Sequence, residues 1–303
     1  MGDLLWRPPR VGERVGVCAP SGPADEARLA RGLSALAAFG VEVVELPQAR
    51  RRDRYLAGGD DERAAALNAL VRDPSIRAIA SARGGYGALR MASALDVAAL
   101  RADPKPLLAF SDATVLHGAW ARAGVASVHG PVLTQLGEQP PESLARARAA
   151  LFGEPLAPLT GLATVASGEA TGPLHGGNLA TLASMVGTPW LPALRGAILL
   201  LEDVGERPYR LDRLFTQLRV SGALDGVAGV VLGDFTDCDE PAKPGVAAYR
   251  GVDVLAALCA SLGVPAVSGA HVGHGDVNLS VPLGRAARLD ATAGVLSFGE
   301  AFR

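Results

Sequence analysis

The chain has 303 residues, 49% of them hydrophobic, and its 29 Lys and Arg against 31 Asp and Glu give a formal net charge of −2. This length allows two ordinary domains with a large core, and the near-neutral charge gives no basic surface for nucleic acid. The longest apolar runs have strand length, so we expect no membrane helix.

The first ten residues and the cysteines bear on the compartment. The N-terminal segment lacks the basic start and apolar core of a secretory signal, so we expect a cytoplasmic protein. The three cysteines are far apart, show no metal-ligand spacing and stand beside apolar residues: Cys18, Cys238 and Cys259. They are expected to be buried structural thiols, and no metal or cofactor is expected.

Strands alternate with helices through the first half of the chain. Apolar runs predict strands that start at Val15 and then cover residues 41–46, 76–82 and 106–110. Between them, helices are predicted over the segment with Leu29, Leu33, Leu36 and Phe39 on one face, and over residues 61–71 and 88–95. This alternation predicts a parallel sheet with helices on both faces and ligands at the carboxyl ends of its strands.

A segment rich in Pro and Gly over residues 138–172 is predicted to hold the domain boundary. We therefore assign residues 1–155 to an N-terminal α/β domain and 170–303 to a C-terminal one. In the second domain, strands are predicted over residues 198–202 and 227–232, with a helix between them that carries Leu211, Phe215 and Leu218 on one face.

Ser111 follows the strand at 106–110 directly and precedes a helix-compatible stretch. A serine on such a bend projects from the sheet edge, and the amide N–H groups that open the helix can receive an oxyanion. The same position also suits a helix N-cap. The hydrolase elbow Gly-x-Ser-x-Gly is absent, because Ala109 and Ala113 replace its glycines.

A nucleophilic serine needs a base and an orienting carboxylate. Glu202 ends a four-residue apolar run, and His274 stands between two glycines on a loop that we expect to be mobile. Asp203 and Glu206 are rival acids, and His271 is the rival histidine. Two further histidines are expected to pack within the first domain: His117 and His129.

The glycine-rich run at residues 83–87 allows several roles. Gly85 is either an oxyanion donor or a turn residue, and Arg83 either holds a terminal carboxylate or braces the loop. Asn178 follows two glycines and is either a turn residue or a substrate contact. The run lacks the Gly-Lys-Ser/Thr ending and the dinucleotide spacing of phosphate loops, so nucleotide binding is disfavoured.

Taken together, the glycine-punctuated motifs of this chain resemble those of the LD-carboxypeptidase family of serine peptidases. The resemblance spans nearly the whole chain and rests on Arg83-Gly84-Gly85-Tyr86-Gly87, Phe110-Ser111-Asp112, Gly176-Gly177-Asn178-Leu179, Leu201-Glu202-Asp203 and Gly273-His274. It implies a flavodoxin-like N-terminal α/β domain, a smaller C-terminal α/β domain and an active site at their interface. It also implies a triad of Ser111, Glu202 and His274.

The resemblance adds expectations for the surroundings of the triad. The amides of Gly85 and Asp112 would receive the oxyanion, with the Asp112 side chain as a helix cap, and Arg83, Tyr86 and Asn178 would contact the substrate. No metal site is implied.

The activity implied is release of the terminal D-alanine from cytoplasmic murein tetrapeptides by a homodimer. The partner would thus be a small muropeptide, with no nucleic acid and no membrane involved. Alternatives are a peptidase for microcin C-type peptidyl-nucleotides and an inactive muropeptide-binding protein. The chain departs from the family pattern at two positions. Ala109 stands where many members have glycine, which requires a negative φ there, and His175 stands before the paired glycines at a position often aromatic in the family, which bears on the substrate cleft.

Overall fold

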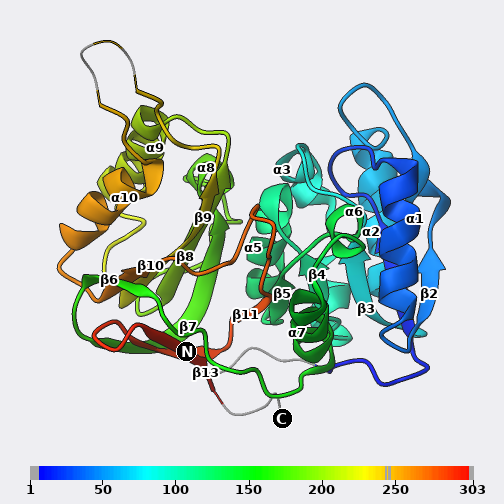
Figure 1. Cartoon of the computed structure of the whole chain (residues 1–303). Helices are drawn as coiled ribbons and strands as arrows, with labels where there is room; N and C mark the ends of the chain where they lie inside the picture. The colour runs from blue at the N-terminus through cyan, green and yellow to red at the C-terminus, as the bar shows by residue number, and fades with distance from the viewer. Residues whose placement is uncertain (1–6, 243, 245–246, 300–303) are drawn as a thin grey trace. The chain divides into compact units, whose positions relative to one another are not determined.

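A computed structural model describes residues 7–242, 244 and 247–299, and the chain divides into two compact units (Figure 1). Of the described residues, 7–156 and 279–284 form the first unit, and 157–278 and 285–299 form the second. Each unit has a sheet of its own. Within the described ranges, no helix is long and apolar enough to cross a membrane.

The first unit contains a sheet of six strands in the order β11-β5-β4-β3-β1-β2. These strands are β1 (Arg14–Cys18), β2 (Glu42–Glu45), β3 (Ile76–Ser81), β4 (Leu107–Ala109), β5 (Ser127–His129) and β11 (Val281–Leu283). β1 to β5 are mutually parallel, and β11 pairs with β5 antiparallel. The order 2-1-3-4-5 is that of flavodoxin-like folds, so this prediction is confirmed.

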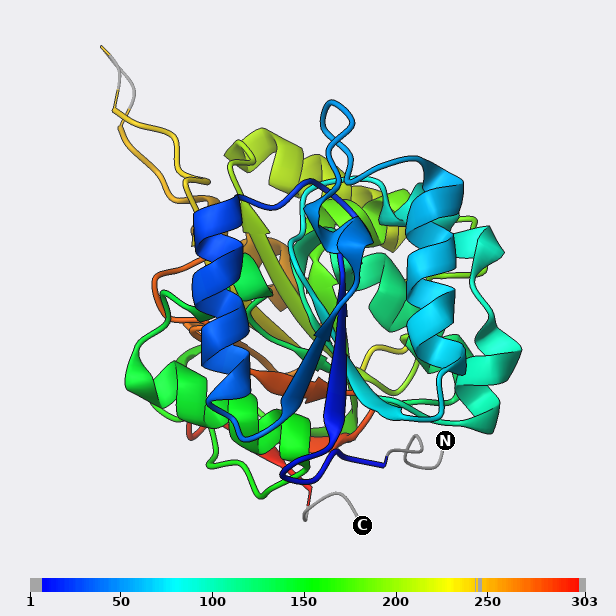
Figure 2. The same cartoon turned by 90° about the vertical axis from the view of Figure 1, so that its right-hand side faces the viewer.

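Helices cover both faces of this sheet, and Figure 2 shows α1 and α2 on opposite sides of β1 and β2. The α-helices are α1 (Glu26–Ala37), α2 (Asp60–Arg72), α3 (Ala88–Met91), α4 (Val97–Ala102), α5 (Thr114–Ala123), α6 (Leu133–Leu136) and α7 (Pro141–Phe152). The 3₁₀ turns are η1 (Pro47–Arg50), η2 (Ala92–Ala94) and η3 (Ser111–Ala113). On the α1 side, Leu29 and Leu36 share a buried core with Val15, Val17 and Leu151.

Two helices are shorter than the sequence predicts. The helix over residues 88–95 is instead α3 followed by η2, because the chain tightens into a 3₁₀ turn after Met91. Phe39 is buried as predicted, but it lies beyond the end of α1. Gly40 then takes a φ of 87°, a conformation that favours glycine and turns the chain toward β2.

The second unit contains a mixed sheet of seven strands in the order β13-β12-β7-β8-β9-β10-β6. These strands are β6 (Ala163–Ala166), β7 (Glu169–Asn178), β8 (Ile198–Val204), β9 (Gly229–Thr236), β10 (Ala266–Ser268), β12 (Ala286–Asp290) and β13 (Val295–Phe298). β7 to β10 are parallel, and β6, β12 and β13 are antiparallel to their neighbours. The unit also holds α8 (Leu179–Ser184), α9 (Pro208–Val220) and α10 (Gly251–Ala260), and α9 packs against both other helices. The α/β class of this half is confirmed.

β11 returns the chain to the first unit. The sequence analysis assigned all of residues 170–303 to the second domain, whereas residues 279–284 cluster with the first unit. Val281 pairs with His129 of β5, and His129 pairs in turn with Ala109 of β4. A three-residue strand carries too short a pattern to reveal its partner from the sequence.

Candidate active site

Ser111 lies on a sharp bend directly after β4 in the first unit. It opens η3, which continues into α5, and its φ of 65° places a non-glycine residue in the left-handed region. Such backbone strain costs about 1–3 kcal/mol and concentrates at functional sites. Ser111 is not a cap residue, because Phe110 holds the N-cap position of η3 and Ala113 that of α5. Ala109 has no positive φ, so alanine is tolerated there.

The glycine-rich loop of residues 83–87 lies against Ser111. A Cβ added to Gly84 would stand 2.9 Å from Ser111 Cβ and 3.1 Å from its Oγ, so this contact requires glycine. The Gly22 amide donates a 3.0 Å hydrogen bond to the Gly84 carbonyl. Gly85 has a φ of 116°, and a Cβ there would approach Gly22 Cα to 3.3 Å. The loops that follow β1 and β3 therefore meet beside the serine.

Asp112 caps a helix, but not the one that follows it. Its Oδ2 accepts a 2.9 Å hydrogen bond from the Ala88 amide at the start of α3, whose N-cap residue Gly87 has no side chain. The Asp112 carboxylate is buried. This bond ties the bend at Ser111 to the end of the 83–87 loop, while the oxyanion role of the Asp112 amide stays a prediction.

Arg83 and Tyr86 are exposed on the same loop. Arg83 Nη1 donates a 2.7 Å hydrogen bond to the Pro23 carbonyl, so it braces the loop after β1. The Tyr86 ring lies 6.0 Å from that of Tyr55, centroid to centroid, and both rings are more than half exposed. Substrate contact by either residue stays a prediction.

The histidines of the first unit are packing residues, as predicted. His117 is buried and lies 3.0 Å from the Ala109 carbonyl and 2.8 Å from Ser127 Oγ. Burial lowers the His117 pKa to about 3, so the ring is neutral at pH 7. His129 is buried with its ring edge-on to Phe110, at a centroid distance of 5.8 Å.

In the second unit, Glu202 and His274 form a pair. Glu202 lies in β8 with a side chain that is 0% exposed, and its Oε2 is 2.7 Å from His274 Nδ1. Burial alone lowers the His274 pKa, but the charge and hydrogen bond of Glu202, with the charges of Asp203 and Asp234, raise it above its ordinary value. A neutral His274 that donates from Nδ1 carries its lone pair on Nε2, which is the form that a general base requires.

The loop that carries His274 is tightly packed, so the expectation of an imidazole with little steric cover is wrong, while the mobility of the loop stays a prediction. Gly273 has a φ of 131°, and a Cβ there would lie 2.7 Å from Glu202 Oε2. The Gly273 amide donates a 3.1 Å hydrogen bond to Asn278 Oδ1, and the His274 side chain is only 17% exposed. Glycine thus lets the backbone rest on the carboxylate and fixes the imidazole.

The rival residues have other partners. Glu206 Oε2 lies 3.5 Å from Arg210 Nη1 on α9. His271 has a side chain that is 69% exposed and stands 3.7 Å from Asp234 Oδ1. Among these candidates, Glu202 and His274 are the acid and histidine in direct contact.

Asp203 and Asn178 form a hydrogen-bonded pair next to Glu202 in the sheet. Asp203 accepts hydrogen bonds from Asn178 Nδ2 at 2.8 Å and from the amides of Val204 and Ala180 at 2.9 Å. Burial is the main cause that raises the Asp203 pKa to about 6. Asn178 Oδ1 also caps α8 through the Thr181 amide, so this residue has a structural role at the end of β7. Its predicted substrate contact stays a prediction.

His175 and the three cysteines are buried residues whose pKa values are shifted. His175 in β7 is buried, and burial lowers its pKa to about 4. The three cysteines are free and buried, as predicted, and burial raises each thiol pKa to about 12. A thiol with such a pKa is a poor nucleophile at neutral pH.

Two charged residues were not singled out by the sequence analysis. Asp234 is a strand-end acid like Glu202, and its amide donates to the Val272 carbonyl at 2.9 Å. The position at the end of an apolar strand was the signal that could have found it. Arg63 is fully buried against the 83–87 loop. The sequence around it instead predicts a solvated arginine, because its helix begins with three acids.

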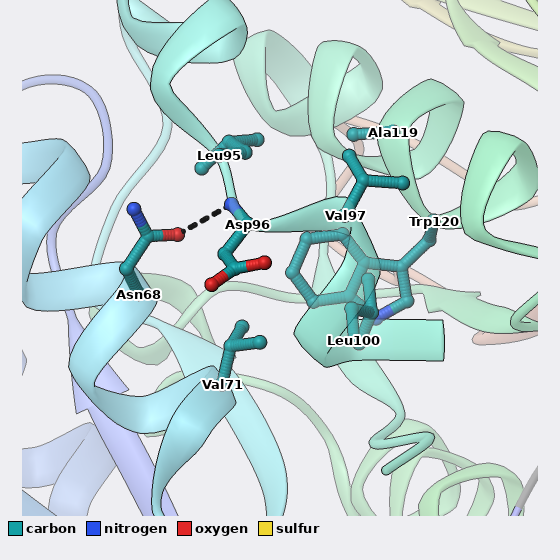
Figure 3. A pocket seen from close by; sticks show the side chains of 8 residues that line it. All are labelled: Asn68, Val71, Leu95, Asp96, Val97, Leu100, Ala119 and Trp120. Carbon is teal, nitrogen blue, oxygen red and sulfur yellow. Dashed lines mark hydrogen bonds between the residues drawn. The ribbon is translucent and has the colours of Figure 1, made fainter. Parts of the chain in front are cut away.

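A small cavity of about 10 Å³ lies elsewhere in the first unit, and Figure 3 shows the side chains that line it. Asn68 Oδ1 accepts a hydrogen bond from the Asp96 amide at its edge. The volume suits about one water molecule. The remaining lining residues are apolar, and none is a predicted site residue: Val71, Leu95, Val97, Leu100, Ala119 and Trp120.

Comparison with known proteins identifies relatives over the whole chain. The model of the LD-carboxypeptidase N-terminal domain matches residues 15–130, and that of the C-terminal domain matches residues 171–289. The murein tetrapeptide carboxypeptidase of Pseudomonas aeruginosa is 34% identical, over 95% of this chain and 96% of that protein.

Solved structures share the fold. The muramoyltetrapeptide carboxypeptidase from Oxalobacter formigenes superposes with a TM-score of 0.84 and 30% identity, over 95% of this chain and 99% of that one. The protein MccF, bound to glutamyl sulfamoyl guanosine, superposes with a TM-score of 0.88 and 28% identity over 99% of each chain. MccF of Escherichia coli is named a microcin C7 self-immunity protein.

Proposed function

Because this chain belongs to the LD-carboxypeptidase family, we propose that it is a serine carboxypeptidase that removes the terminal D-alanine from cytoplasmic murein tetrapeptides. The observation that carries the proposal is the 2.7 Å contact between His274 Nδ1 and the buried Glu202 carboxylate. This contact orients the imidazole and favours the tautomer whose lone pair lies on Nε2, as a general base requires.

Ser111 is the proposed nucleophile, and its strained bend beside Gly84 supports that role. The chain path also supports a meeting of Ser111 and His274. The chain enters the first unit at Leu279, five positions after His274, and a segment of that length spans at most about 18 Å. β11 then joins β5, the neighbour of the strand that precedes Ser111.

The reaction would proceed in two stages. Ser111 Oγ attacks the carbonyl carbon of the diamino acid while its proton passes to His274 Nε2, and the amides of Gly85 and Asp112 stabilise the oxyanion. The C–N bond then breaks as His274 protonates the leaving D-alanine amine. Water next attacks the acyl-enzyme and gives a proton to His274, which returns it to Ser111 as the tripeptide product leaves.

The main test is D-alanine release by Ser111→Ala. We expect activity on a murein tetrapeptide to fall at least about 10³-fold while the circular dichroism spectrum and the Tm stay unchanged, because the triad acts as a unit. Release is measured by mass spectrometry. Wild-type turnover by a folded Ser111→Ala variant contradicts the proposal.

The likeness to MccF favours a second candidate, a peptidase for peptidyl-nucleotides. A glutamyl sulfamoyl nucleoside and a murein tetrapeptide compared in one assay separate the two. Labelling with a fluorophosphonate separates both from an inactive muropeptide-binding protein, because only an activated Ser111 reacts. We also propose that the enzyme acts as a homodimer, which sedimentation equilibrium tests.

A further inference from the structure

Arg63 is a buried cation beneath the loop that lies against Ser111. It belongs to the first turn of α2, and its side chain is 0% exposed. Among the described residues its one carboxylate partner is Asp60, three residues earlier, and this carboxylate is itself 31% exposed. Arg63 Nε is buried and has no hydrogen-bond partner among the described residues.

Helix stability alone does not explain a charge at this position. A buried ion pair is often no more stable than apolar residues of similar volume, and an unpaired buried donor adds a further cost. A methionine would fill the same space without either cost. The reason for a guanidinium at this position must therefore lie in the hydrogen bonds that its other nitrogens donate.

One nitrogen of Arg63 joins the two loops that meet at Ser111. Nη1 donates to the Pro20 carbonyl, in the loop after β1, and to the Gly87 carbonyl at 2.9 Å, in the loop after β3. Gly87 has a φ of 119°, and a Cβ there would stand 2.9 Å from Nη1, so the guanidinium rests directly on this backbone.

The segment between Gly84 and Ala88 is thereby held at both ends. Gly84 is fixed by the Gly22 amide and by its contact with Ser111. At the other end, Gly87 is fixed by Arg63, and the next amide, of Ala88, by Asp112. Gly85, the proposed oxyanion donor, lies between the two anchors. A donor stabilises an oxyanion only when it is oriented in advance of the reaction.

We propose that Arg63 is a positioning residue for the oxyanion site, which sets the Gly85 amide by clamping the Pro20 and Gly87 carbonyls. This inference rests on the proposed function, because it uses Ser111 as the nucleophile and Gly85 as a donor. Arg63 acts through the backbone and touches no reacting atom.

Arg77 provides a matched control. It is also a buried arginine with one carboxylate partner, Asp103 at 2.8 Å, and its Nε likewise lacks a hydrogen bond among the described residues. It lies near the amino end of β3, whereas the 83–87 loop follows the carboxyl end. Arg77→Met therefore reproduces the loss of a buried cation without touching either loop.

The experiment compares Arg63→Met, Arg63→Lys and Arg77→Met in the full chain. For each variant, D-alanine release gives kcat and KM, and a fluorophosphonate gives the rate constant for modification of Ser111. The fraction of molecules that the fluorophosphonate labels counts the active molecules, and kcat is divided by this fraction. We expect Arg63→Met to lose about 10- to 100-fold in kcat and in labelling rate with KM within about threefold. Arg63→Lys should regain part of this loss, since an ammonium can donate to both carbonyls, and Arg77→Met should lower only the Tm.

Three results overturn the inference. These are an unchanged kcat per labelled site in Arg63→Met, equal losses in Arg63→Met and Arg77→Met, or wild-type protein whose Ser111 does not react. If Arg63→Met does not fold, Arg63→Lys against Arg77→Met decides. Wild-type protein that is labelled at Ser111 but releases no D-alanine contradicts the proposed substrate alone, and the labelling rates still test Arg63.

Discussion

The surroundings of Ser111 in the first unit and of His274 in the second unit position these side chains by different means. In the first unit, backbone geometry places the serine: Ser111 has a positive φ, Gly84 touches it, and hydrogen bonds join the loops around it. In the second unit, a buried charge places the histidine, because Glu202 holds His274 Nδ1 at 2.7 Å.

This difference indicates how each half fails when it is altered. Backbone placement is sensitive to volume, since one methyl group added at Gly84 would displace Ser111. Electrostatic placement is sensitive to charge, since removal of a carboxylate alters both the orientation and the pKa of its histidine. Substitutions of each kind should therefore have distinct signatures.

Removal of the Glu202 charge should have the largest effect. Glu202→Gln preserves shape, so we expect the fold to persist while kcat falls about 10³-fold or more. Glu202 raises the His274 pKa, and the base must be neutral, so the wild-type rate declines as pH falls through a value above 6.5. In Glu202→Gln this acid limb should move to lower pH. A pH profile of kcat/KM measures it, and an unmoved limb counts against the pair as the catalytic base.

An added methyl group at Gly84 tests the backbone half. Gly84→Ala would place a Cβ 2.9 Å from Ser111 Cβ, so we expect kcat to fall about 100-fold without a shift of the pH profile. The control is Gly59→Ala, because a Cβ there meets no atom within 4 Å. Steady-state kinetics at several pH values check this. A shifted acid limb in Gly84→Ala would contradict the distinction between placement by backbone contacts and placement by charge.

The pH dependence of stability should reveal the neutral His117, which contacts the Ala109 carbonyl at the end of β4. The His117 pKa is about 3 in the folded protein and near 6.5 when unfolded, because burial disfavours the charged ring. Between these values the unfolded chain binds a proton that the folded chain does not, so the free energy of unfolding falls with decreasing pH. His117→Gln should remove up to about 1.4 kcal/mol per pH unit from that slope. Urea unfolding at pH 7, 6 and 5 measures how the free energy of unfolding changes with pH in the wild type and in His117→Gln. The change per pH unit should be smaller in the variant, and equal changes contradict the prediction.

Loss of an exposed ring should have the smallest effect. Tyr86→Ala removes a side chain that is 55% exposed and contacts Tyr55, so we expect stability to change by less than about 0.5 kcal/mol. If Tyr86 contacts the peptide, KM should rise about 2- to 10-fold with kcat unchanged, the effect of one aromatic contact. The matched control is Tyr209→Ala, an exposed tyrosine on α9. Equal KM values in the wild type, Tyr86→Ala and Tyr209→Ala would show that Tyr86 does not contact the substrate.

Local patterns predicted much of the fold, the bend at Ser111 and the contact between Glu202 and His274. The apolar run at residues 198–201 identified a buried strand, and the acid that follows it pairs with the histidine between glycines. The break from Phe110 to Ser111 predicted the bend, because the apolar pattern ends there abruptly.

The features that escaped prediction depend on contacts between distant residues. Asp112 has the sequence of a local cap, yet it caps α3 through a bond that the chain path alone creates. Arg63 resembles a solvated helix residue until the loops after β1 and β3 cover it. The packing of the His274 loop likewise follows from its contact with β8, which loop glycines do not reveal.

The placement of β11 has a consequence for synthesis on the ribosome. β5 is made about 150 residues before β11, the strand that pairs with its outer edge, so this edge stays uncovered until residues 281–283 have been synthesised. An uncovered edge is a template for pairing with other chains. Nascent molecules that stall after β5 but before β11 should therefore aggregate through this edge.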